Sequence, residues 1–259
     1  MDAPLAGRLA IVTGVSRRIG IGFAIAQRLL ADGALVFVHS WSAHDEAQPW
    51  GADDDGIDAL ITSLGHSDRV GHLEADFAEP DTPAQVVAAA HERFGAVDIL
   101  IANHARSSQQ TLETVTADEL DLSWAVNARA TLLLVQAFAA QHDDARPGGR
   151  VVLFTSGQHL APMPNELPYA VSKGAIHQMT ASLADHLADR RITVNAINPG
   201  PTDPGWADSG LNDAVAQSMP FGRWGAPTDA ANLVSFLVSD AGAWITGQVI
   251  NSEGGFRRS

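Results

Sequence analysis

Short apolar runs alternate with segments of helical periodicity along almost the entire chain. The apolar runs fall at residues 9–12, 35–39, 70–74, 99–102, 151–154, 193–197 and 249–250. The helical segments between them cover residues 21–31, 57–64, 83–93, 117–141, 170–188 and 229–238. Strands that alternate with helices pair in parallel, and right-handed crossovers place the helices on both faces of the sheet. The sequence therefore predicts an α/β fold with a doubly wound parallel sheet of about seven strands.

No linker, repeat or low-complexity block interrupts this pattern over the 259 residues. One α/β domain of this length is ordinary, so we predict a single domain over residues 1–259. Two segments depart from the rhythm: residues 40–56 form a long connection, and residues 199–219 combine prolines and glycines with little periodicity. We expect the second segment to be a mobile loop beside the substrate site.

Acidic side chains outnumber basic ones by 30 to 16, which gives a formal net charge of −14. A phosphate backbone is bound by clustered Lys and Arg, so we expect no nucleic acid partner. The longest apolar runs are far shorter than the roughly 20 residues of a membrane span, and the N-terminus shows no signal-type pattern. We therefore expect a cytoplasmic protein that does not bind membranes. The sequence has no cysteine and no metal-ligand spacing among its ten histidines, which predicts no metal site.

A glycine-rich segment, T-G-V-S-R-R-I-G-I-G at residues 13–22, joins the first predicted strand to the first predicted helix. Gly14 permits a tight turn, Gly20 lets the backbone approach a pyrophosphate, and Gly22 allows close packing of the helix. The N–H groups and positive dipole end of that helix would face the phosphates. The segment predicts a dinucleotide-binding loop, with a glycine-rich turn that binds no ligand as the alternative.

The end of the second predicted strand decides which dinucleotide is expected. NAD-binding sheets usually carry a carboxylate there for the ribose hydroxyls, whereas this chain has His39, Ser40 and Trp41. Arg17 and Arg18 lie in the glycine-rich segment, where a guanidinium could pair with a 2′-phosphate. We therefore predict NADP, with NAD as the alternative, and the two arginines would otherwise be solvated surface charges.

The chain has a single tyrosine and a single lysine, Tyr169 and Lys173, one helical turn apart. A phenol has an ordinary pKa near 10, and a cation held close favours its ionised form. Lowering that pKa to about 7 takes roughly 4 kcal/mol of differential stabilisation. Together with Ser156, the pair predicts a proton donor for carbonyl chemistry, and the alternative is a helix-surface pair without a chemical role.

These residues resemble the short-chain dehydrogenase/reductase family over nearly the whole chain. The resemblance includes T-G-x5-G-I-G, Asp76, I-A-N-H-A at residues 101–105, V-N-A at 126–128, Y-A-V-S-K at 169–173, N-P-G at 198–200 and I-T-G-Q-V near the end. It implies a Rossmann-type sheet in which Tyr169 is the general acid/base and Ser156 polarises the carbonyl. Lys173 would bind the nicotinamide ribose and lower the pKa of Tyr169, and Asn127 would anchor a water on the proton path.

The resemblance also implies a set of cofactor contacts. They are Gly14, Ser16, Arg17, Arg18, Gly20, Ile21, Ser40, Trp41, Asp76, Phe77, Asn103, Tyr169, Lys173, Pro199, Gly200 and Thr202. The glycine loop is two residues longer than the commonest form, which resembles enoyl-reductase-like members. The Tyr–Lys spacing of four nevertheless favours carbonyl over enoyl reduction. The family often has a cofactor-contacting threonine at the position of Pro204, and we expect Thr202 to make that contact instead.

Within the family the chain is most similar to 3-oxoacyl-thioester reductases, including those acting on acyl carrier protein. The resemblance implies an NADP(H)-dependent oxidoreductase that reduces a ketone to a secondary alcohol, and a homotetramer. An acidic carrier protein would be repelled by a chain of charge −14, so a free small ketone or secondary metabolite is an alternative substrate. Alternatives of other kinds are a non-catalytic NADP-binding sensor or scaffold and a sugar-nucleotide epimerase or dehydratase.

Overall fold

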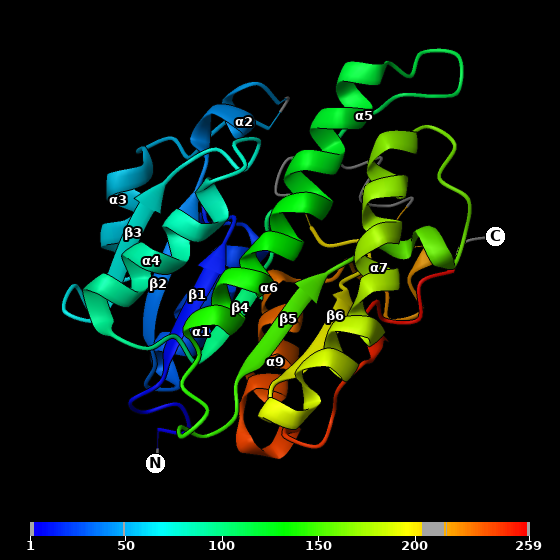
Figure 1. Cartoon of the computed structure of the whole chain (residues 1–259). Coiled ribbons are helices and arrows are strands. Elements are labelled where there is room, and N and C mark those ends of the chain that lie inside the picture. Colours follow the sequence, from blue (N-terminus) through cyan, green and yellow to red (C-terminus); the bar gives the residue numbers. More distant parts are fainter. Residues whose placement is uncertain (1–2, 49, 204–214, 216, 258–259) are drawn as a thin grey trace.

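Seven parallel strands form one sheet in the computed structural model, which describes residues 3–48, 50–203, 215 and 217–257 (Figure 1). The strands are β1 Leu9–Thr13, β2 Leu35–Ser40, β3 Val70–Glu74, β4 Ile99–Ala102, β5 Arg150–Phe154, β6 Thr193–Asn198 and β7 Val249–Asn251. Their spatial order is β3-β2-β1-β4-β5-β6-β7, and every neighbouring pair is parallel. This arrangement confirms the predicted doubly wound sheet.

The strand order reverses at β1, which pairs with β2 on one side and with β4 on the other. Ala10 is in register with Val36 of β2 and with Ile99 of β4. All residues of β1 and β4 are buried, because helices cover both faces of these central strands. Ligands of such sheets bind outside the carboxyl ends of the strands where the order reverses.

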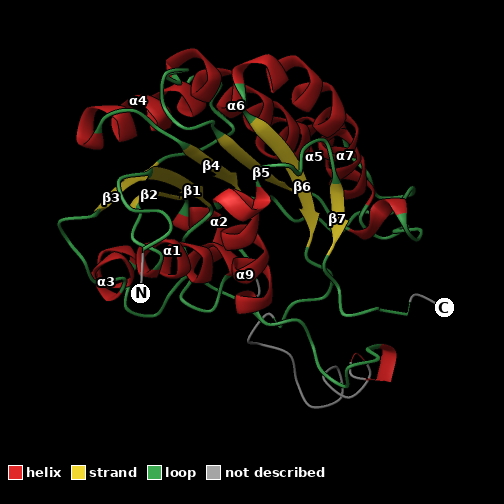
Figure 2. Ribbon diagram, turned by 90° about the horizontal axis from the view of Figure 1, so that it is seen from below, coloured by secondary structure: helices red, strands yellow, loops and turns green. Residues whose placement is uncertain are grey.

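Helices cover the two faces in two layers (Figure 2). Residues of α1 (Ile21–Ala31), α3 (Ile57–Ser63) and α9 (Pro227–Val238) pack on one face. Residues of α4 (Thr82–Phe94), α6 (Ala130–Gln141) and α7 (Leu167–Leu187) pack on the other. Successive strand side chains point to opposite faces, so Val12 joins the first core and Ile11 the second.

Two predicted segments differ in detail from the structure. The single helix predicted over residues 117–141 consists of α5 (Ala117–Ser123), a π-helical turn at Trp124–Arg129 and α6. The predicted long connection at 40–56 contains a short helix, α2 (Ser42–Glu46), which folds back beside the end of β2. Of the predicted mobile loop, residues 204–214 and 216 lie outside the described part of the chain.

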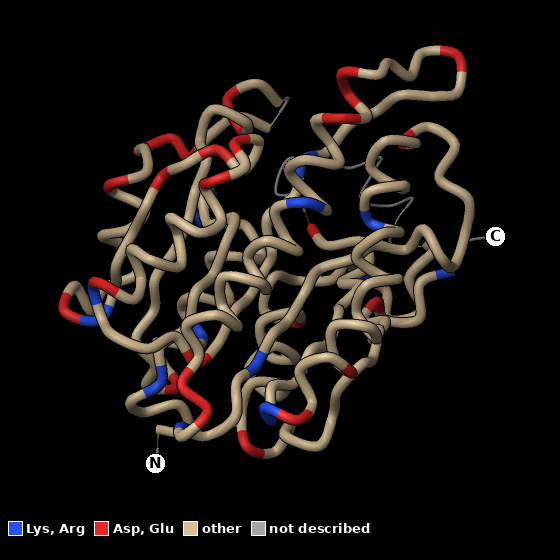
Figure 3. The backbone as a smooth tube through the Cα atoms, in the orientation of Figure 1, with Lys and Arg blue, Asp and Glu red and all other residues tan. Residues whose placement is uncertain are grey.

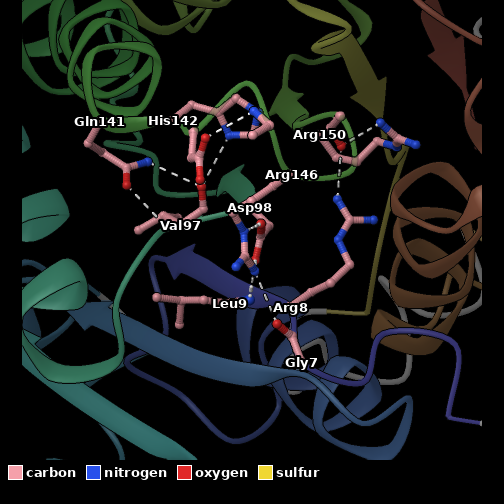
Figure 4. A network of polar contacts seen from close by, with 12 residues as sticks. Gly7, Arg8, Leu9, Val97, Asp98, Gln141, His142, Arg146 and Arg150 are labelled. Carbon is pink, nitrogen blue, oxygen red and sulfur yellow. Dashed lines mark hydrogen bonds and ion pairs between the residues drawn. The ribbon is translucent and has the colours of Figure 1, made fainter.

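A buried polar cluster connects neighbouring strands at the amino-terminal edge of the sheet (Figure 4). The carboxylate of Asp98 accepts a hydrogen bond of 2.9 Å from the backbone N–H of Leu9 and pairs with Arg146 at 2.7 and 2.9 Å. Arg8 donates to the carbonyl of Val238 at 2.9 Å. Asp98 is 1% exposed, so the cluster ties β1 to the start of β4 inside the protein.

Candidate active site

A cavity of about 340 Å³ opens at the carboxyl ends of β1, β2 and β4. Its lining includes eight of the predicted cofactor contacts: Gly14, Ser16, Arg17, Gly20, Trp41, Asp76, Phe77 and Asn103. Because β1 and β4 are the strands at which the order reverses, the cavity lies where a doubly wound sheet binds its ligand.

The turn after β1 requires glycine at two positions. Gly14 has a φ of +74°, and a Cβ there would lie 2.8 Å from the Cα of His104. A Cβ on Gly22 would lie 2.4 Å from the carbonyl oxygen of Gly14. The start of helix α1 therefore packs closely against the turn. No side chain forms a capping hydrogen bond at the N-cap residue, Gly20. The positive end of the helix dipole at this cavity suits an anion such as a pyrophosphate.

The two loop arginines have different surroundings. Arg17 lines the cavity, with its guanidinium carbon 5.9 Å from the centroid of the Trp50 ring. Arg18 instead pairs with Asp53, at 3.1 Å, and with Asp55. The prediction placed both arginines at the cofactor, but the structure brings only Arg17 to the cavity, because the acidic turn before α3 holds Arg18.

A carboxylate that the sequence analysis missed also lines this cavity. Asp45, on α2, accepts hydrogen bonds from the hydroxyl of Ser16 and, at 2.8 Å, from Nε1 of Trp50. The expectation from His39, Ser40 and Trp41 that no carboxylate lies at the end of β2 was wrong, because α2 turns back toward the glycine loop and brings Asp45 there. The only sequence signal was an Asp five residues beyond the strand, with nothing to indicate that turn.

Four further predicted contacts lie elsewhere. Ser40 is fully buried and hydrogen-bonds Nε2 of His72 at 2.8 Å, because it points away from the cavity that His39 and Trp41 line. Ile21 packs against the core beneath α1. Pro199 and Thr202 follow β6 and line neither this cavity nor the second one described below. The Thr202 hydroxyl donates to the carbonyl of Gly200 at 3.3 Å.

Two buried histidines stack with Phe77 beneath the cavity. The rings of His39 and His104 lie 4.0 and 4.3 Å from the Phe77 ring. His104 Nδ1 lies 2.7 Å from the Thr13 hydroxyl, and its Nε2 lies 3.0 Å from the carbonyl oxygen of Val126. Burial lowers the pKa of His39 to about 4 and that of His104 well below its usual value. Both rings are therefore neutral supports at neutral pH.

A second cavity, of about 490 Å³, opens at the carboxyl ends of β5 and β6. Ser156 lines it two residues after the end of β5, and Gly200 lines it two residues after the end of β6. The remaining lining consists of Gly157, Ala161, Pro162, Met163, Glu166, Asn198, Pro201 and Phe256. This mixture of an apolar wall and a few polar groups is typical of a small-molecule site.

Helix α7 brings Tyr169 and Lys173 to the same face beside Ser156. The Ser156 side chain is close enough to the Tyr169 phenol to lower its pKa, and the Lys173 ammonium nitrogen lies 5.7 Å from the centroid of the Tyr169 ring. Lys173 is 1% exposed and donates to the carbonyl of Phe154 at 2.8 Å. The structure therefore brings Tyr169 and Lys173 next to Ser156, which lines the second cavity.

Burial is the main cause of the pKa shifts of both Tyr169 and Lys173 in this structure. It raises the pKa of Tyr169, with the Glu166 carboxylate acting in the same direction and the Ser156 hydrogen bond opposing it. Burial lowers the pKa of Lys173 to about 7. Lys173 is not among the causes of the Tyr169 shift in this structure, so the predicted lowering of the phenol pKa by the lysine stays a prediction.

Asn127 lies in the π-helical turn between α5 and α6 and is fully buried. Its amide donates to the carbonyl of Arg106 at 3.0 Å and to the Ser172 hydroxyl at 2.9 Å, and its Oδ1 accepts from the backbone N–H of Arg106 at 2.7 Å. The side chain thus joins the segment after β4 to α7. Such π-turns occur frequently at functional sites.

The described part of the chain holds neither a candidate metal site nor a membrane-spanning helix. Among residues 3–48, 50–203, 215 and 217–257, no three His, Asp or Glu side chains form a group able to hold a metal ion. None of the helices in this described part of the chain is both long and apolar enough to cross a bilayer.

The parallel sheet, the glycine turn and the Ser–Tyr–Lys group define an oxidoreductase of the dinucleotide-binding class, and comparisons with known proteins agree. The model of the Enoyl-(Acyl carrier protein) reductase family matches residues 14–257. The uncharacterized oxidoreductase YjdA of Bacillus subtilis (strain 168) is 38% identical over 252 residues, covering 97% of this chain and 97% of that protein.

Solved structures give the same result. The short-chain dehydrogenase/reductase from Serratia marcescens BCRC 10948 superposes with a TM-score of 0.84 at 31% identity, covering 97% of this chain and 99% of that chain. The angucycline C-6 ketoreductase LanV, solved with bound NADP, gives 0.83 at 33% identity, covering 97% and 96%. The chain belongs to the short-chain dehydrogenase/reductase family and is an oxidoreductase that acts on CH–OH or C=O groups. The family resemblance seen in its motifs is confirmed.

Proposed function

We propose that the protein reduces a ketone to a secondary alcohol with NADPH, in a single domain. The observation that carries the proposal is the group of Ser156, Tyr169 and Lys173 beside a cavity at the carboxyl edge of the sheet that also carries the glycine turn. A phenol and a hydroxyl beside one cavity can donate two hydrogen bonds to one carbonyl oxygen. Such donors stabilise the negative charge that develops there.

The roles of the side chains follow from their positions. The cofactor, when bound, supplies the hydride to the carbonyl carbon. Tyr169 gives its phenolic proton to the carbonyl oxygen, and Ser156 donates a hydrogen bond to the same atom. Lys173 has a pKa of about 7, so it exchanges protons readily at neutral pH and is suited to restore the proton of Tyr169. Asn127 positions α7 through Ser172.

The residues of the first cavity fit a phosphorylated dinucleotide. Gly14 and Gly22 leave space that any Cβ would fill, α1 presents its amino end, and Arg17 adds a cation. LanV, a relative of known structure, holds NADP. We therefore propose NADP(H) as the cofactor and Arg17 as the contact to its 2′-phosphate.

A small ketone suits the second cavity better than a carrier-bound thioester does. Acidic residues gather around α2, α3 and α5, close to the carboxyl edge of the sheet (Figure 3). An acidic carrier protein would be repelled there, in line with the net charge of −14. LanV is a ketoreductase of a secondary metabolite, which supports the same substrate class. Reduction of a 3-oxoacyl thioester remains the second candidate, supported by the name of the matching family model.

The test of this function is NADPH oxidation at 340 nm over a panel of aryl and alkyl ketones and 3-oxoacyl thioesters. We expect turnover of at least one free ketone, with a chiral secondary alcohol as the product. Absence of turnover with every carbonyl, despite saturable NADPH binding, would instead support a non-catalytic binding protein.

Replacing Arg17 with Ala should raise the KM for NADPH roughly 10- to 100-fold, because a charge-assisted hydrogen bond to a phosphate is lost. The KM for NADH should change much less. Arg18→Ala is the matched control, since Arg18 pairs with Asp53 and Asp55 outside the cavity. Equal effects of the two variants, or an unchanged NADPH preference in Arg17→Ala, would contradict the assignment.

A homotetramer built on the long helices is also proposed. Trp124 beside α5 and Val171 on α7 are 50% and 58% exposed, and these neighbouring helical segments lie side by side (Figure 1). Large exposed apolar side chains on adjacent helices mark protein–protein contact surfaces. Sedimentation at micromolar concentration should give a tetramer, and a monomer would refute the proposal.

A further inference from the structure

The second cavity contains one acidic side chain, Glu166, among the residues that line it. Ala161, Pro162, Met163 and Phe256 form an apolar wall, and Ser156 and Asn198 are the other side chains able to form hydrogen bonds. Glu166 lies three residues before Tyr169, and its charge is close enough to raise the pKa of the phenol. A substrate whose carbonyl reaches Ser156 and Tyr169 therefore shares the cavity with this carboxylate.

The Glu166 carboxylate makes no hydrogen bond or ion pair with any residue that the structure describes, although its backbone is bonded. Its N–H donates to the carbonyl of Met163, and its carbonyl accepts from the N–H of Ala170. The side chain is half-buried, and burial raises its pKa. Among the residues outside the described part (1–2, 49, 204–214, 216 and 258–259), the sequence contains one Lys, Arg or His, Arg258.

Other buried or half-buried carboxylates of the chain have partners. Asp45 is bound by Ser16 and Trp50, Asp98 by Arg146, and Glu119 by Arg106. A partly desolvated carboxylate without a partner is costly, and a bound ligand that supplies a cation or a donor recovers that cost. Glu166 is therefore placed to be satisfied by the substrate.

We propose that Glu166 selects substrates by charge, so that the preferred ketones carry an ammonium group and ketones carrying a carboxylate are disfavoured. This inference rests on the proposed ketone reduction. The ammonium group would sit against Glu166 while the carbonyl oxygen lies at Ser156 and Tyr169. The apolar wall would hold the carbon skeleton between the two ends.

The test uses three ketones of one shape: 4-phenyl-2-butanone, its para-aminomethyl derivative and its para-carboxylate. At pH 8 the wild-type kcat/KM should follow the order ammonium, neutral, carboxylate. The two extremes should differ about tenfold or more, because opposite and like charges a few ångströms apart differ by at least that factor in a partly dry site. We expect most of the discrimination in KM.

Glu166→Gln should reduce the ratio between the ammonium and carboxylate ketones to about twofold or less, as the charge is removed and the size is kept. Glu166→Lys should invert the order, which separates loss of charge from loss of structure. Glu113→Gln removes the same unit of charge from an exposed glutamate bonded to Thr111 and should keep the wild-type order.

The outcomes separate the two proposals. If the wild type reduces none of the three ketones or any other carbonyl with either cofactor, the proposed function fails. If it reduces the neutral ketone without ranking the charged pair, the assignment of Glu166 is overturned. The assignment is also overturned if the wild-type order survives in both Glu166 variants. Retained thermal unfolding transitions in the variants show that they are folded.

Discussion

Tyr169→Phe should lower kcat roughly 10²- to 10⁴-fold while leaving NADPH affinity nearly unchanged. The change removes one oxygen atom, the proton donor beside Ser156, and keeps the ring that packs near Lys173. The phenol lies beside Ser156, which lines the second cavity, and it does not line the first, where the cofactor contacts gather. The measurements are steady-state turnover of the best ketone and a fluorescence titration with NADPH.

The titration is the internal control of this experiment. A loss of turnover together with a comparable loss of NADPH affinity would mean that Tyr169 acts in binding or folding. A kcat within about threefold of the wild type would mean that another group supplies the proton. The chain has no second tyrosine that could substitute, so the result is unambiguous.

Asp98→Ala should lower the free energy of unfolding by about 1–3 kcal/mol, because it leaves the buried N–H of Leu9 unsatisfied and removes the partner of Arg146. Arg8, close by, loses a favourable charge interaction as well. Urea unfolding at pH 7 measures the effect. The cofactor site lies at the opposite edge of the sheet, so NADPH affinity of the folded variant should be kept.

Asp144→Ala is the matched control for Asp98→Ala. The cluster that contains Asp98 is shown in Figure 4. Asp144 also pairs with an arginine, Arg190, but at the surface, where such a pair contributes little to stability. Equal effects of the two substitutions would show that the buried cluster does not stabilise the sheet. A decrease of less than about 1 kcal/mol in the free energy of unfolding of Asp98→Ala would show the same.

The sheet was predictable because its strands are buried on both faces. The central strands, such as β1 and β4, read as uninterrupted apolar runs, and the helices between them have their own periodicity. The Ser156, Tyr169 and Lys173 group was predictable for a related reason. A spacing of four puts two residues on one helix face, and a residue directly after a parallel strand lies at the carboxyl edge.

The contacts that were predicted less well depend on chain directions which local spacing does not encode. Asp45 reaches the first cavity only because α2 folds back, and Arg18 leaves it only because Asp53 and Asp55 come near. Ser40 has the right position along β2, but it lies on the opposite side of the strand from its neighbours at the cavity.

The pKa values of Tyr169 and Lys173 could not be predicted from the sequence either. The Tyr169–Lys173 spacing indicates a cation near a phenol, yet the pKa of each group depends on how deeply it is buried. Packing of α7 against β5 places the ammonium of Lys173 on the carbonyl of Phe154 and away from water. Its pKa of about 7 follows from that burial and not from the spacing.

The most direct test of the account is a ¹³C NMR titration of tyrosine labelled at Cζ, which gives one signal because the chain has one tyrosine. In the protein without cofactor, the pKa of Tyr169 should lie above its ordinary value of about 10. With NADP⁺ bound it should fall below that value in the wild type and not in Lys173→Met. A phenol whose pKa stays raised with NADP⁺ bound, or falls equally without the lysine, would contradict proton donation by this pair.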